Sequence, residues 1–175
     1  MEYRAALRIA KQAQAQLEPV CHRTEVAGSV RRKKEWCKDI EIVCIPIREK
    51  TIDLFGEETE QAVKGFVDAV HGLGDILKGS PESGKYVQVD TGEICIDIFI
   101  VRPETWGLQL AIRTGCAEFS KKLVTRIKYA GYTIRETQIY SGDILIPCKE
   151  EGDVFACVGL PREIEPYTRT EDYNL

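Results

Sequence analysis

The sequence predicts an α+β fold in which a mixed β-sheet with helices on one face is followed by a small α+β lobe. Apolar residues alternate around Asp97, which is typical of a strand, whereas over residues 2–17 they recur every three or four positions, which is typical of a helix. The pattern changes after Pro103, where two helical segments follow each other. We therefore expect two lobes, spanning residues 1–112 and 113–175.

The first lobe is expected to begin with an amphipathic helix over residues 2–17, which Pro19 ends. A strand should then lead into Gly28-Ser29, a turn of small residues that feeds a short basic helix. The spacing of valines around Phe66 predicts a second long helix. The elements expected after the first helix are a strand at 22–27, a helix at 29–34, a strand at 39–45, a helix at 57–71, a strand at 76–78 and a hairpin of 85–89 with 93–101.

The second lobe is expected to pack helices against short strands. Two helices should meet at Thr114-Gly115-Cys116, where small residues permit a tight turn. The elements expected after Pro103 are helices at 104–112 and 117–130, strands at 132–134, 138–140 and 144–146, and a last helix at 151–158.

The composition is that of a globular protein: 175 residues, 43% hydrophobic and 30% charged. No apolar run approaches the ~20 residues of a membrane span, and the first residues lack the apolar core of a signal peptide. The seven cysteines are scattered without a Cys-x-x-Cys pair, which argues against a disulfide framework and a zinc site. We expect a monomer in the cytoplasm with reduced thiols and no membrane partner.

The charge distribution is uneven. The net charge of −4 argues mildly against an extended nucleic-acid surface, because neutralising phosphates normally requires a basic face. Basic residues are nevertheless concentrated in 31–34 and 121–128. These two stretches allow weak, local contact with nucleic acid.

Three carboxylates are predicted to converge. Asp39 and Glu41 are two residues apart, so on a strand they project to the same face, with Cα atoms about 6.5 Å apart. Asp97 stands in the middle of an apolar strand, where a lone charge is costly to bury. If the two strands are neighbours, the acids form one cluster, and a divalent metal ion is the simplest partner that would hold them together.

Each of these signals also has an ordinary explanation. Gly28-Ser29 before a helix can be a simple N-cap, and Asp39 with Glu41 can be a solvated strand edge. Asp97 can pair with an arginine, and the lysines of 121–128 can be a solvated helix face. The co-occurrence of all of them, in order along one chain, favours a functional site.

In this order and spacing the motifs resemble the nucleotidyltransferase signature, a Gly-Ser followed by an acid-x-acid pair and a distal third acid. The double arginine after Gly-Ser resembles the family X DNA polymerases, the polymerase beta group, more than other members. Residues 113–120 resemble the Thr-Gly-Ser-x-x-Phe-Asn segment of that group, and residues 151–161 resemble the end of its thumb. The residues that carry the signature are Gly28, Ser29, Arg31, Arg32, Asp39, Glu41 and Asp97.

The resemblance covers nearly the whole chain, and it implies a nucleotidyltransferase palm followed by a thumb. It implies the minimal form of the family, without the lyase domain that precedes the palm in larger members. Such a chain is expected to hold DNA weakly.

The resemblance also implies a reaction: metal-dependent nucleotidyl transfer from a nucleoside triphosphate to a 3′-hydroxyl, most directly short-gap DNA synthesis on a template. The implied partners are the triphosphate and weakly held primer-template or gapped DNA. Two Mg²⁺ ions, for which Mn²⁺ can substitute, would be held by Asp39, Glu41 and Asp97. The implied nucleotide-binding residues are Gly28, Ser29, Arg32, Lys38, Arg113, Gly115 and Ser120, and the implied DNA-binding residues are Lys121, Lys122 and Arg126.

Several positions depart from the family pattern. Glu41 stands in place of an aspartate, which bears on metal placement, and Lys38 in place of a glycine adds a side chain beside the phosphate site. Ile112-Arg113 replaces an aromatic pair beside the incoming sugar, and Ser120 replaces an asparagine that touches the base. Sugar selection and fidelity therefore do not follow from the resemblance.

Two other functions remain open. A template-independent nucleotidyltransferase acting on RNA, a small molecule or a protein would use the same acids with another acceptor. A non-catalytic nucleotide-binding module would keep the fold without the reaction.

Overall fold

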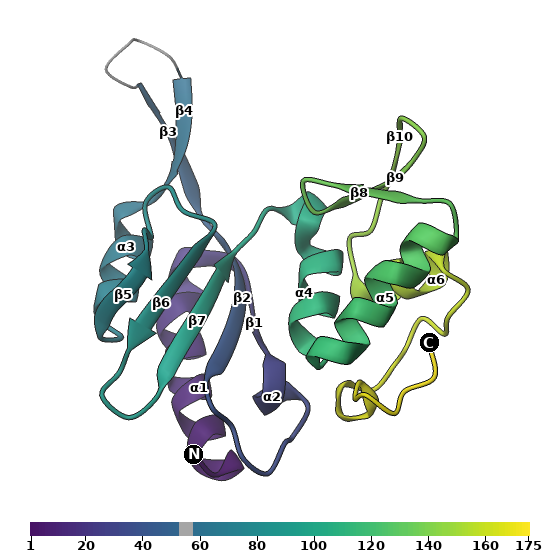
Figure 1. Ribbon diagram of the computed structural model, residues 1–175. Helices are drawn as coiled ribbons and strands as arrows, with labels where there is room; N and C mark the ends of the chain where they lie inside the picture. Colours follow the sequence, from purple (N-terminus) through teal and green to yellow (C-terminus); the bar gives the residue numbers. More distant parts are fainter. Residues whose placement is uncertain (53–57) are drawn as a thin grey trace.

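The computed structural model describes residues 1–52 and 58–175, and it has an α+β fold. A five-stranded sheet with the strand order β1-β2-β7-β6-β5 forms the first lobe. Helices α1 and α3 cover one face of this sheet, and the second lobe lies against the other face (Figure 1). The sheet elements are β1 (Cys21–Ala27), β2 (Ile40–Pro46), β5 (Asp75–Gly79), β6 (Tyr86–Asp90) and β7 (Cys95–Ile100), and the helices are α1 (Tyr3–Leu17) and α3 (Lys64–His71).

The sheet is mixed, as predicted. β2 pairs with β7 in parallel, whereas β1 with β2, β6 with β7 and β5 with β6 are antiparallel. Two short elements complete the start of the chain, the 3-10 turn η1 (Glu18–Val20) and the single-turn helix α2 (Gly28–Arg31). Since β2 and β7 are adjacent and parallel, residues near their starting ends lie side by side.

Alternation along the two central strands separates an apolar face from a polar one. The side chains on the first face are buried against α1 and α3, and each contributes roughly 1.5–3 kcal/mol of hydrophobic free energy. The face opposite carries the acids at the start of the strands and apolar residues further along. The residues of the apolar face are Ile40, Ile42 and Cys44 of β2, and Ile96, Ile98 and Ile100 of β7.

The helix predicted over residues 57–71 is wrong in its first part. Residues Glu58–Ala62 form strand β4, which pairs antiparallel with β3 (Arg48–Ile52), and α3 begins only at Lys64. Cross-strand contacts explain this hairpin: the hydroxyls of Thr51 and Thr59 are 3.0 Å apart. The apolar spacing that suggested a helix begins only at Val63. Residue 57 lies outside the described residues.

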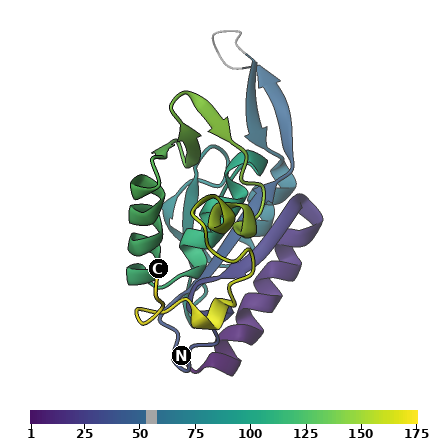
Figure 2. The same ribbon diagram turned by 90° about the vertical axis from the view of Figure 1, so that its right-hand side faces the viewer.

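The second lobe has its own core. Helices α4 (Trp106–Thr114), α5 (Ala117–Tyr129) and α6 (Glu151–Cys157) surround a three-stranded sheet of β8 (Thr133–Arg135), β9 (Gln138–Ser141) and β10 (Ile144–Ile146), with 3-10 turns η2 (Pro103–Thr105) and η3 (Pro166–Thr168). Figure 2 shows that the β9–β10 hairpin and the β3–β4 hairpin project at the same end of the molecule. The buried side chains of this core include Leu108, Phe119, Leu123, Ile127 and Phe155.

Helix α4 joins the two lobes. Its Trp106 and Leu110 pack with Val43 and Phe99 on the second face of the large sheet, while Leu108 belongs to the core of the second lobe. The division of the chain at residue 112 therefore stays a prediction.

The other predicted helices and strands are present, with small shifts at their ends. Within residues 1–52 and 58–175, no helix is both long enough and apolar enough to cross a membrane.

Candidate functional site

The three predicted acids lie on one face of the large sheet. Glu41 of β2 and Asp97 of β7 are register partners in the parallel pair, and Asp39 directly precedes β2. Glu41 and Asp97 alternate with residues buried against α1 and α3, so both side chains lie on the opposite face, and Asp39 lies close enough for charge interactions with both. They lie near the start of β2, at the other end of the sheet from the β3–β4 hairpin (Figure 1).

Burial, together with neighbouring acids, raises the pKa of Glu41 and of Asp39. Burial raises the pKa of Glu41 to about 7, and the nearby charge of Asp39 adds to this shift. Burial also raises the pKa of Asp39, with a further contribution from Asp97. Nearby positive charges offset these pKa shifts only in part. Arg113 and Arg32 lower the pKa of Glu41, and Lys38 and Arg32 lower the pKa of Asp39. The charged forms of both carboxylates are therefore disfavoured in this structure.

Asp97 is oriented by two side chains of the neighbouring strand β6. Its Oδ1 accepts hydrogen bonds from Tyr86 Oη at 2.7 Å and from Gln88 Nε2 at 2.9 Å. Burial, and then the hydrogen bond to Asp97, raise the pKa of Tyr86 to about 12, so its hydroxyl stays protonated and donates. Sequence reasoning missed both residues, although Tyr86 and Gln88 alternate on a predicted strand that pairs with the strand of Asp97.

The donor set suits Mg²⁺ in number, charge and chemistry, because this ion prefers carboxylate oxygens. As arranged, however, no three His, Cys, Asp or Glu side chains among the described residues could hold a metal ion together. The contacts explain why: Glu41 lies against Gly28, and Asp97 is held by β6. The predicted metal ligands thus share a face without converging on one point.

The Gly28-Ser29 turn lies directly beside Glu41. Gly28 has a φ of +61°, and a Cβ at this position would overlap the carboxylate of Glu41. The resemblance implied that Gly28 contacts the nucleotide, but in this arrangement the space beside Gly28 is occupied by Glu41. Only a glycine permits this close approach of an acid to the turn.

Ser29 does not cap helix α2, so the N-cap explanation of Gly28-Ser29 does not apply. The residue at the N-cap is Ala27, and no side chain accepts a capping hydrogen bond there. The Ser29 Oγ is instead buried without a hydrogen-bond partner among the residues described. An unsatisfied buried hydroxyl costs about 1–3 kcal/mol, so a hydrogen-bond partner for this oxygen would be stabilising.

Arg31 has a structural role. Its guanidinium makes a two-pronged ion pair with Glu151 of α6, at 2.9 and 2.8 Å, and donates to Thr114 Oγ1 at 2.7 Å. Arg169 donates to the same carboxylate from the other side. Burial disfavours the charged carboxylate, but the hydrogen bonds from both arginines outweigh it and lower the pKa of Glu151. This cluster ties α2 to α6 across the two lobes.

Two further predicted nucleotide-binding residues lie close to the acids. Arg32 donates to the backbone carbonyl of Thr114 at 2.6 Å, and its charge lowers the pKa of Asp39 and Glu41. Arg113, at the end of α4, places its guanidinium 3.8 Å above the centre of the Phe99 ring. The Nε of Arg113 is buried without a partner among the described residues.

The remaining predicted nucleotide contacts are less well placed. Lys38 is exposed next to Asp39, and Gly115 ends helix α4. Ser120 Oγ donates to the carbonyl of Ile112 at 2.7 Å, so its hydroxyl is already used within the protein.

The predicted DNA-binding residues on α5 are not brought next to the acids, since α4 lies between α5 and the large sheet (Figure 1). Lys122 donates to the carbonyls of Glu171 and Tyr173, at 2.8 and 3.3 Å, and Arg126 Nε donates to the carbonyl of Val158 at 3.0 Å. Lys121 pairs with Glu118 at 2.9 Å. These three side chains make contacts within the second lobe, and their contact with DNA stays a prediction.

No protein-family model matches the sequence, and no curated protein matches it at a significant level. What the chain does is therefore inferred from the placement of its own side chains.

Proposed function

We propose that this chain is a metal-dependent nucleotidyltransferase that joins a nucleoside triphosphate to a 3′-hydroxyl, most directly a minimal family X DNA polymerase that fills short gaps. One observation carries the proposal: Glu41 and Asp97 are register partners on adjacent parallel strands, with Asp39 on the same face. The Ser29 hydroxyl, which is buried without a hydrogen-bond partner in the described part of the chain, belongs to the turn that Glu41 contacts. Acids and anion-binding donors thus lie side by side.

The three acids would hold the metal once their side chains turn toward one another, since they do not converge as arranged. Two bound Mg²⁺ ions supply charge stabilisation at the attacking and the leaving oxygens of an in-line phosphoryl transfer. Asp97 suits the place nearest the attacking hydroxyl, because Tyr86 and Gln88 fix its orientation through Oδ1. Its Oδ2 accepts no hydrogen bond within the described residues, so this oxygen is available to a metal or a proton.

The triphosphate would be recognised by donors that the protein leaves unsatisfied. Ser29 Oγ and Arg113 Nε are both buried without partners among the described residues. Arg32 carries a guanidinium beside the same acids. Hydrogen bonds to phosphate oxygens would satisfy these groups and balance the charge of the ligand.

In this proposal the first lobe acts as the palm and the second as the thumb. The ion cluster of Arg31, Glu151 and Arg169 fixes the second lobe against α2, and so places Arg113 over the sheet. The proposal also includes a cytoplasmic location and weak binding of DNA.

The test is incorporation of a labelled nucleotide with Mg²⁺ or Mn²⁺, run side by side on gapped duplex, single-stranded DNA and RNA. Template-matched addition to the gap is the expected result. Addition that ignores the template would favour the alternative nucleotidyltransferase, with another acceptor. Absence of incorporation on every substrate, with triphosphate still bound, would leave a non-catalytic nucleotide-binding module and overturn the proposal.

A further inference from the structure

The loop between α2 and β2 exposes a tryptophan that the proposed reaction does not use. The chain has two tryptophans, and they differ sharply: Trp106 is 1% exposed in the core, whereas Trp36 is 63% exposed. A large aromatic side chain left in water forgoes hydrophobic stabilisation of a few kcal/mol, roughly 1.5–3 kcal/mol for other large apolar side chains. An exposed indole offers a flat aromatic face on which another ring can stack.

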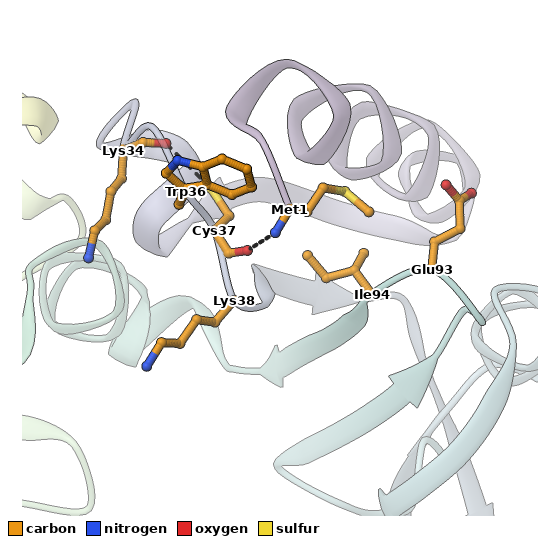
Figure 3. Close-up of a pocket in the computed structure, with 7 residues that line it drawn as sticks. All are labelled: Met1, Lys34, Trp36, Cys37, Lys38, Glu93 and Ile94. Carbon is orange, nitrogen blue, oxygen red and sulfur yellow. Dashed lines mark hydrogen bonds between the residues drawn. The ribbon is translucent and has the colours of Figure 1, made fainter.

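The exposure of Trp36 does not come from a loose loop. Glu2 and Trp36 form an isolated antiparallel β-bridge. The flanking backbone makes hydrogen bonds from Tyr3 N to the Glu35 carbonyl at 2.9 Å and from Cys37 N to the Met1 carbonyl at 2.8 Å. The indole is therefore presented from a fixed backbone, beside the pocket shown in Figure 3.

Three lysines lie near this aromatic side chain, together with the acids Glu2, which forms the bridge to Trp36, and Glu93, which lines the same pocket. Lys33, Lys34 and Lys38 are exposed and make no ion pair within the described part of the chain, and Glu35 is the one acid between them. Figure 3 shows the side chains of Lys34 and Lys38 extending to the same side. A protein of net charge −4 thus concentrates three lysines around one exposed indole.

We infer that residues 33–38 form a platform for single-stranded nucleic acid, on which Trp36 stacks with a base while Lys34 and Lys38 contact the flanking phosphates. An indole face can stack only with a base that is free of its duplex neighbours, and lysines attract the backbone without regard to sequence. Lys38 adjoins Asp39, so a strand bound here lies next to the candidate site. The inference deepens the proposed function, on which it rests for taking nucleic acid as the acceptor.

The test measures binding without catalysis: the anisotropy of a fluorescein-labelled oligothymidylate titrated with the protein in EDTA. Replacing Trp36 by alanine should weaken binding roughly tenfold, since stacking contributes about 1–3 kcal/mol per base. Trp36→Phe keeps an aromatic face and should retain most of the affinity. Ile144→Ala, which truncates a similarly exposed apolar residue in the second lobe, should leave binding unchanged.

The lysines are tested by salt dependence. Lys34→Ala and Lys38→Ala should each lower the slope of log affinity against log salt by about 0.7. Lys78→Ala, an exposed lysine on β5, is the matched control and should leave the slope unchanged. A blunt duplex should bind wild type and Trp36→Ala equally.

Two results would overturn the platform: no binding of the oligonucleotide, or equal binding by wild type and Trp36→Ala. The nucleotide-incorporation assay is read separately. Trp36-dependent binding without incorporation would refute the proposed function and leave the platform standing, whereas incorporation with Trp36-independent binding would refute the platform alone.

Discussion

Glu41 and Asp97 face each other as register partners across the parallel pair of β2 and β7. Adjacent strands lie about 4.8 Å apart, so the two acids are held on one face by the backbone itself. Two like charges at this spacing repel, and the pKa of Glu41, raised to about 7 mainly by burial, reflects an environment that disfavours its charge. If this arrangement serves a function, replacing the acids should change activity or metal binding more than stability.

Asp97→Asn is expected to abolish nucleotide transfer while leaving the fold intact. An amide is a poor metal ligand and accepts no proton from the attacking hydroxyl, so we expect a loss of at least roughly 100-fold, or about 2.7 kcal/mol of transition-state stabilisation. The asparagine oxygen still accepts from Tyr86 and Gln88, so the urea midpoint should hardly move. Asp75→Asn on β5, an exposed aspartate, is the control. Full turnover by Asp97→Asn would contradict the assignment.

Mg²⁺ or Mn²⁺ alone should stabilise the protein, because a divalent cation relieves the repulsion among the three acids. At about ten times the dissociation constant the gain is about 1.4 kcal/mol, which thermal unfolding detects. The double variant Asp39→Asn with Glu41→Gln should lose this response. An equal rise in melting temperature for wild type and variant would show that the cation binds elsewhere.

Ser29→Ala separates a ligand-binding hydroxyl from a structural one. The Oγ has no partner among the described residues, so its removal should leave the free energy of unfolding unchanged or slightly higher. A hydrogen bond to a charged group contributes about 1.5–3 kcal/mol, so the KM for triphosphate should rise by roughly tenfold or more. Ser80→Ala, which removes an exposed hydroxyl bonded to Glu82, is the matched control. Destabilisation with an unchanged KM would assign the Ser29 hydroxyl to the fold.

The sequence predicted the face on which the acids lie, because a two-residue repeat determines the side of a strand. The same reasoning failed for residues 58–62: the strand is mostly polar, and the apolar spacing of the helix that follows was extended back over it. Tyr86 and Gln88 could have been predicted as neighbours of Asp97. Their strand was predicted to pair with the strand of Asp97, and alternate residues of such a strand lie on the same face as Asp97.

Other features of the site depend on contacts that no local pattern encodes. Arg31 and Glu151 are 120 residues apart in the chain, and their ion pair follows only from the way the second lobe packs. The approach of Glu41 to Gly28 likewise follows from pairing of β1 with β2, and not from the Gly-Ser motif. The motif indicated where an anion site would be sought, which stays a prediction, but it did not reveal that an acid lies against its glycine.

Glu151→Gln is expected to destabilise the protein and to flatten the acid side of its stability profile. The arginine hydrogen bonds, which outweigh the cost of burial, lower the pKa of Glu151 below its unfolded value of about 4.3. Its stabilising contribution is therefore complete above that pH and is lost as the pH falls through the lower, folded-state pKa. Removing one partner of a largely buried pair costs about 3 kcal/mol, which urea unfolding at neutral pH should show.

At a pH below the folded-state pKa of Glu151, the difference between wild type and Glu151→Gln should shrink, because the carboxyl is then protonated in both the folded and the unfolded wild-type protein. Glu118→Gln is the control: its pKa is also lowered, by its hydrogen bond to Lys121, but the pair is exposed and solvent screens it. That variant should unfold like wild type at every pH. If Glu151→Gln also unfolded like wild type at every pH, the ion cluster of Arg31, Glu151 and Arg169 would not stabilise the contact between the lobes. The position of Arg113 near the acids would then not depend on α6.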